Sequence, residues 1–212
     1  MLRALVKLWP SADDIPNAYQ TMHQIVEIMG FFAKADYFVP LVLGILSDES
    51  FKNSHKNTIV LLNILAHMLK ETTQLQSHFS ALAGTLRNYE AQFYDNDEGL
   101  LSLLAVMNVL LKSEGDFTHE LLQVGFQVLL NVTATKTIAD VRRNDASAAM
   151  EELAKRGGFN SVAELHASEI GPILERLLEG KEYTSWNRTN KNRFKFDSIV
   201  RNCSSEVARF LN

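Results

Sequence analysis

The chain has 212 residues, 46% of them hydrophobic and 22% charged, with a formal net charge of −4, a composition that excludes intrinsic disorder as the main description. Stretches without Asp, Glu, Lys or Arg reach 15 residues, as in Leu121–Thr135, which is shorter than a membrane-spanning helix requires. The single cysteine, Cys203, excludes an internal disulfide framework and a multi-cysteine zinc site, and indicates a reducing, intracellular compartment.

Apolar residues recur at helical spacing along almost the whole sequence, and no stretch alternates as a half-buried strand would. Residues 1–9 resemble the end of a helix without a cap, which we interpret as an open N-terminal end that packs on a neighbour or continues a longer array. A capping-box pattern at Ser11–Asp14 predicts a first complete helix to about Phe32. The next helix is expected over Asp36–Leu46, with Pro40 in its first turn or at a kink.

Two of the later predicted helices are apolar on nearly every side. They are Thr58–Leu69, which follows a polar opening, and Leu100–Leu111. A helix of this kind must be covered on more than one face. A capping box at Ser161–Glu164 begins another helix, in which Gly171–Pro172 is expected to cause an interruption and a kink. Further helices are expected over about residues 73–87, 117–132, 138–156, 161–178 and 190–211.

The spacing of these helices indicates a repeat. The second helices of successive pairs begin near residues 36, 73, 117 and 161, and pairs repeating every roughly 40–47 residues are typical of HEAT and armadillo proteins. We therefore predict an all-α fold, an α-solenoid of about four stacked antiparallel pairs plus terminal helices, forming a single domain over residues 1–212. An irregular helical bundle is the alternative. The spacing and the all-round apolar inner helices favour the solenoid.

The sequence contains no familiar catalytic or phosphate-binding motif, so we expect no enzyme activity, cofactor or metal. Residues 95–99 resemble the opening of a calcium loop, but Gly99 comes one position early and Val106 stands where a bidentate acid belongs. A turn that caps the next helix is the better interpretation. The histidines have no close helical partners and are interpreted as structural: His23, His55, His67, His78, His119 and His166.

Charge and aromatic residues gather at the C-terminal end. Residues 181–212 carry a net charge of +4 and the rest of the chain −8. The acidic body argues against nucleic-acid binding, whereas the basic end is the best local candidate for contact with a protein partner. The alternative is that its aromatic rings pack back onto the last repeat and its cations are simply solvated. The candidate contact residues are Tyr183, Trp186, Arg188, Lys191, Arg193 and Lys195.

Residues 25–46, 149–178 and 185–203 resemble the C-terminal part of the factor-5 family of HEAT-repeat dynein axonemal assembly factors. In that family the last repeat leads into a Trp and an F-D helix, which here are Trp186 and Phe196–Asp197. Members of the family are much longer, with more repeats on the N-terminal side. The resemblance implies a non-enzymatic, cytoplasmic scaffold that works alongside chaperones to pre-assemble the heavy and intermediate chains of ciliary and flagellar dynein arms.

Two other functions stay open at this stage. A tubulin-binding array of the TOG type would use basic and aromatic residues on the loops inside each pair. The corresponding loops, near Ala33–Asp36, Lys70–Thr73, Lys112–Asp116 and Arg156–Asn160, are mixed in charge and lack Trp, which counts against this function. An importin-like or trafficking adaptor would have the same composition and the same repeats.

Overall fold

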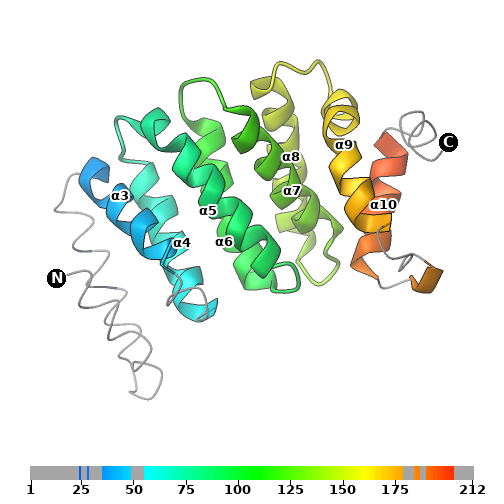
Figure 1. Cartoon of the computed structure of the whole chain (residues 1–212), viewed down its shortest axis with the longest axis horizontal. Helices are drawn as coiled ribbons and strands as arrows, with labels where there is room; N and C mark the ends of the chain where they lie inside the picture. Colours follow the sequence, from blue (N-terminus) through cyan, green and yellow to red (C-terminus); the bar gives the residue numbers. More distant parts are fainter. Residues whose placement is uncertain are drawn as a thin grey trace.

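The computed structural model describes Gln24, Ile28 and residues 35–48, 55–178, 184–186 and 190–202. These residues form α-helices and short 3-10 segments, with no strand among them (Figure 1). The prediction of an all-α fold is therefore confirmed. In chain order the helices are α3 (Ala35–Leu46), α4 (His55–Leu69), η2 (Leu75–His78), α5 (Phe79–Gln92), α6 (Asp97–Lys112), α7 (His119–Ala134), α8 (Asp140–Arg156), α9 (Val162–Leu178) and α10 (Lys191–Asn202).

The helices stand in two rows that run along the longest axis of the molecule (Figure 1). In one row α4 contacts α6 and α6 contacts α8, and in the other α3 contacts α5 and α5 contacts α7. The starts of α4, α6 and α8 are 42 and 43 residues apart. Stacking of like helices at this period is the geometry of a HEAT-type α-solenoid, so the predicted architecture is confirmed over the irregular bundle.

The two helices predicted to need cover on several sides, α4 and α6, hold the centre of the core. Leu61, Leu62 and Leu65 of α4 are fully buried, as are Leu100 and Leu103 of α6. Complete burial of each such side chain contributes roughly 1.5–3 kcal/mol. Because α6 packs against α4, α5, α7 and α8, its apolar residues are covered by both rows at once.

Side-chain caps begin two helices, α6 and α9, where the sequence predicts them. The Asn96 side chain accepts a hydrogen bond from the Gly99 backbone N–H at 2.8 Å, so the acidic 95–99 segment caps α6. The Ser161 hydroxyl oxygen accepts from the Glu164 N–H at 3.1 Å, while the Glu164 carboxylate accepts from the Asn160 N–H at 2.8 Å. The carboxylates near these helix starts also interact favourably with the positive end of the helix dipole, which stabilises the helices.

The helix predicted over residues 73–87 differs from the observed one. A 3-10 turn, η2, comes first, and α5 then continues to Gln92. The cause is Asp36 on α3, whose carboxylate accepts hydrogen bonds from the Thr73 backbone N–H at 2.9 Å and from the Thr73 hydroxyl at 2.7 Å. The hydroxyl bond lowers the pKa of Asp36. This tie between successive pairs holds residues 73 and 74 in a turn.

The two internal prolines lie inside continuous helices. The predicted interruption at Gly171–Pro172 is wrong, because α9 runs through both residues. Pro40 is the sixth residue of α3, beyond the first turn. Both prolines are exposed, so the carbonyl group that loses its helical partner lies on the side where water can bind it.

Several predicted features lie outside the described residues. They are the uncapped segment 1–9, the helix expected from Ser11 to Phe32 apart from Gln24 and Ile28, which are both helical, the thiol of Cys203 and the end of the terminal helices.

His166 is a buried histidine that joins α9 to α7. Its ring is 3% exposed and packs edge-on against Phe126, with 4.8 Å between the ring centroids. Its Nδ1 atom has no hydrogen-bond partner in the described part of the chain. Burial lowers the pKa of His166 to about 4. The side chain is therefore neutral at physiological pH and acts as an apolar ring in the core.

Replacing Gly99 tests the close packing at the start of α6. We expect Gly99→Ala to lower the free energy of unfolding by about 1–2 kcal/mol, because the new Cβ would lie 2.3 Å from the Cγ atom of the fully buried Phe93 ring. Urea denaturation measures the change. Gly84→Ala on α5 is the matched control, since nothing lies within 4 Å of its Cβ position, and it should raise stability by up to about 1 kcal/mol. A gain at both positions would contradict the packing of Phe93 over Gly99.

The lowered pKa of His166 predicts that the protein loses stability in acid. Its pKa falls from 6.5 to about 4 on folding, so below pH 6.5 the unfolded chain binds the proton more readily and stability decreases until about pH 4. The loss attributable to this residue is roughly 3 kcal/mol. Denaturant melts of the parent and of His166→Leu between pH 4 and 7 measure it. The variant should show a shallower pH dependence, and parallel curves would rule out this role for His166.

Candidate protein-binding surfaces

The basic C-terminal segment is packed against the solenoid. Helix α10 contacts both α7 and α9. It follows the last pair, α8 and α9, and lies alongside α9 (Figure 1). Trp186 is half-buried against the core, with its ring centroid 6.0 Å from that of Phe196. Of the other candidate contact residues, Tyr183 and Arg188 lie outside the described residues. The structure therefore places Trp186, Lys191, Arg193 and Lys195.

Two of these cations contact one tyrosine in the turn between α5 and α6. Lys191 donates from Nζ to the carbonyl oxygen of Tyr94, and the Tyr94 hydroxyl donates to the Asn192 side chain. Lys195 is 5% exposed, and its Nζ lies 4.0 Å from the centroid of the Tyr94 ring. Burial lowers the pKa of Lys191, an effect opposed by Asp95, Asp97 and Glu90. We call this set of contacts around Tyr94 the α10 latch.

The outer side of α10 is less enclosed. The side chain of Arg193 is 43% exposed, and its Nε lies 3.8 Å from the Asp197 carboxylate, a surface pair of small energetic weight. Phe194 is half-buried beneath Lys136 of the turn before α8, whose Nζ is 3.8 Å from the ring centroid. The use of this segment as a partner surface stays a prediction. Among its described cations, Arg193 and Arg201 reach solvent, whereas Lys191 and Lys195 face Tyr94.

A groove on the outer side of α6 is a feature that the sequence did not reveal. A cavity of about 930 Å³ lies at the end of α6 near the loops, lined among others by Lys70, Gln76 and Lys112. A second cavity of about 440 Å³ continues toward the start of α6 and is lined by residues of α4, α6 and α8. Ala105 and Asn108 line both cavities, so the two form one groove along the helix. We call it the α6 groove.

The loop after α6, which borders the α6 groove, is held by side chains that contact its backbone. The Arg156 guanidinium donates to the carbonyl oxygens of Ser113 and Gly115 and lies 4.6 Å from the Phe117 ring. Gly115 has φ of +99°, a conformation that favours glycine, and its Cβ position is filled by the Gln76 side chain. The loop is therefore bound by Arg156 of α8 and packs against Gln76 of η2.

The loops considered for tubulin binding are in part used internally. Arg156 faces the protein's own backbone, and Asp36 binds Thr73 of the next loop. Within the described residues, no three His, Cys, Asp or Glu side chains are grouped so that they could hold a metal ion. A helix long and apolar enough to cross a membrane is likewise not found in this part of the chain.

Comparison with known proteins gives two findings. The HEAT-repeat domain described for dynein axonemal assembly factor 5 matches residues 1–136, well over half of the chain. The human protein named dynein axonemal assembly factor 5 is 27% identical over 192 residues, which cover 89% of this chain and 21% of the human protein. The chain thus spans about a fifth of the length of that relative. No solved structure matches it.

The α10 latch predicts a difference between two substitutions of Tyr94. Tyr94→Ala removes the ring beneath the two lysines and should lower the free energy of unfolding by about 2–3 kcal/mol. Tyr94→Phe keeps the ring and loses the hydroxyl bond to Asn192, so a loss of about 1 kcal/mol is expected. Urea denaturation followed by circular dichroism measures both. Equal losses would mean that the ring does not hold α10.

Proposed function

Because the chain belongs to the HEAT-repeat family of dynein axonemal assembly factor 5, we propose that it is a non-enzymatic scaffold for the assembly of axonemal dynein arms. The match of that family's HEAT-repeat domain over residues 1–136 is the observation that carries the proposal. Since the chain corresponds to about a fifth of the human relative, the proposed role is the binding of client proteins by this stretch of repeats.

The proposed clients are the heavy and intermediate chains of ciliary and flagellar dynein arms, held in the cytoplasm together with chaperones. Two rows of stacked helices support this role, since such an array offers a long, continuous surface to a large client. Three polar side chains that could take part in chemistry make structural contacts instead. His166 is buried against Phe126, Arg156 binds loop carbonyls, and Lys191 binds the carbonyl of Tyr94.

Affinity purification from a ciliated cell tests the proposal. The tagged chain, expressed in such cells and captured from cytosol, should recover dynein heavy and intermediate chains with chaperones, identified by mass spectrometry. A HEAT solenoid of similar size from an unrelated family is the control for capture by any helical array. Recovery of tubulin alone would favour the TOG-type function, and recovery of nuclear cargo alone would favour the importin-like one. Either result would reject the assembly role.

Arg193 gives a point test of the C-terminal contact. Arg193→Glu changes a side chain that is 43% exposed, so the melting temperature should stay unchanged while recovery of dynein chains falls by about threefold or more. The matched control is Lys155→Glu on α8, where the reversed side chain is 70% exposed and lies on another helix. Equal recovery by Arg193→Glu and Lys155→Glu would remove Arg193 from the proposed contact.

A further inference from the structure

The α6 groove has an apolar floor on one side of one helix. Leu101, Ala105 and Val109 follow each other at four-residue intervals on α6, so they form a single stripe. All three are half-buried and pack on the core from outside it. The side chains that stand above them on the flanking helices, such as Asn63 of α4 and Arg142 of α8, are exposed. The middle helix of the row is therefore recessed between its two neighbours.

The dimensions of the groove suit a helix. From Leu101 to Lys112 the floor extends for about 17 Å at roughly 1.5 Å per residue, which is three helical turns. Neighbouring helices pack about 8–10 Å apart, and α4 and α8 flank α6 on its two sides, so a helix seated over α6 would lie between them. Strand addition, one way of binding an extended peptide, is not offered by the described part of the chain, which has no strand.

Charge distinguishes the two ends of the groove. Lys70 and Lys112 line the loop end, and neither forms an ion pair with a carboxylate in the described residues, although Glu114 lines the same cavity. The wall that α4 provides contains no acidic residue. The opposite end carries Glu98 together with Arg142, whose guanidinium pairs with Asp145. The loop end is thus the more basic of the two.

From these contacts we propose that the α6 groove binds an amphipathic helix of a client protein, with acidic residues at the end that lies beside Lys70 and Lys112. The apolar face of that helix covers Leu101, Ala105 and Val109. This inference rests on the proposed scaffold function and adds the site and the chemistry of the bound segment. The preformed loop end favours binding, because Arg156 already binds the carbonyl oxygens of Ser113 and Gly115.

Binding of synthetic helices to the purified chain tests the proposal by fluorescence anisotropy. The probe is a labelled peptide of about 18 residues, long enough to be partly helical alone, with a Leu/Ala stripe and Glu in its last turn. A second peptide carries Lys in place of Glu, and a third has the first peptide's composition in a non-amphipathic order. The acidic amphipathic peptide should bind about tenfold more tightly than either of the others. Equal binding of all three would overturn the proposal.

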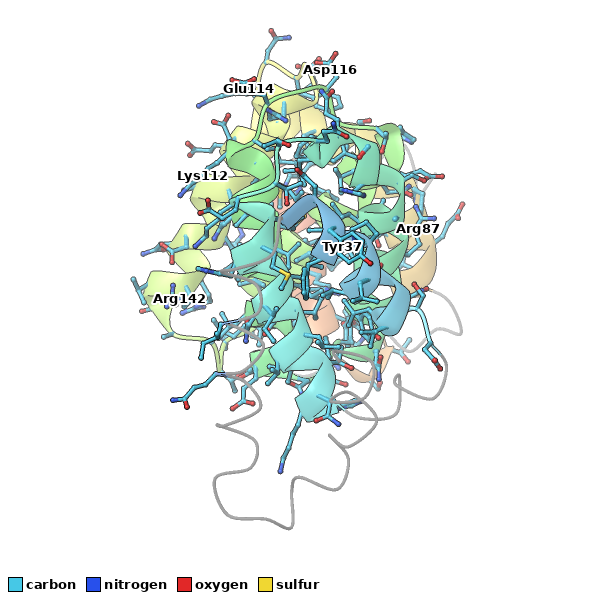
Figure 2. All side chains as sticks on the ribbon, turned by 90° about the vertical axis from the view of Figure 1, so that its left-hand side faces the viewer. Tyr37, Arg87, Lys112, Glu114, Asp116 and Arg142 are labelled. Carbon is cyan, nitrogen blue, oxygen red and sulfur yellow. The ribbon has the colours of Figure 1, made fainter. Side chains whose placement is uncertain are left out.

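Variants of the chain locate the binding. Ala105→Arg fills the floor of the groove and should weaken binding of the acidic peptide by about tenfold. Lys112→Glu changes an exposed residue and should remove the preference for the Glu-containing peptide over the Lys-containing one. Arg87→Glu is the control, because Arg87 lies on the opposite side of the molecule from Lys112 and Arg142 (Figure 2). Melting temperatures check folding. If Ala105→Arg does not fold, Lys112→Glu decides, and an effect of Arg87→Glu equal to that of Lys112→Glu would reject the site.

The same variants separate this inference from the function on which it rests. Recovery of dynein chains from cytosol that is unchanged by both Ala105→Arg and Lys112→Glu would reject the groove and leave the scaffold function intact. Specific peptide binding in the groove, combined with purifications that contain no dynein chain, would instead reject the assembly role and leave a helix-binding site.

Discussion

The fold depends on the need to cover α4 and α6 on more than one side. A helix with one apolar stripe can lie on a surface, but the fully buried leucines of α4 and α6 require neighbours in the same row and in the other row. Stacking of pairs meets that need at every position along the row. The resulting surface is long and assembled from outward helix faces, and both candidate contact surfaces are parts of it.

The C-terminal segment shows how one composition can serve two purposes. Basic and aromatic residues that are suited to binding a partner are equally suited to holding a helix against its own protein. In α10, Lys191 binds the carbonyl oxygen of Tyr94 and Lys195 lies over its ring, whereas the Arg193 side chain is partly exposed and pairs with Asp197. The Asp95 and Asp97 carboxylates nearby favour the charged form of Lys191. Part of the positive charge of the C-terminal segment is therefore compensated by carboxylates of the same chain.

Apolar periodicity was sufficient to predict the pairs and their spacing, and residue types predicted a capping turn over residues 95–99 and a capping box at Ser161, because these features follow from residues close together in sequence. Other features depend on residues far apart. The turn at Thr73 is held by Asp36, 37 residues earlier, and α10 is held in part by Tyr94, 97 residues before Lys191. The α6 groove depends on how deeply one helix sits between two others, which no local pattern records. Continuity of α9 through Pro172 depends on which side of the helix meets water.

The α10 latch also bears on the order in which the protein folds. Ties between neighbouring pairs, such as Asp36 with Thr73, span about one repeat, so each pair can settle as it leaves the ribosome. The contact between Tyr94 and Asn192 spans 98 residues and forms only after α10 has been synthesised. Until then the side of α7 that α10 covers stays open to solvent and to other chains. Between the synthesis of α7 and that of α10 the nascent protein therefore exposes an apolar surface that the finished protein buries.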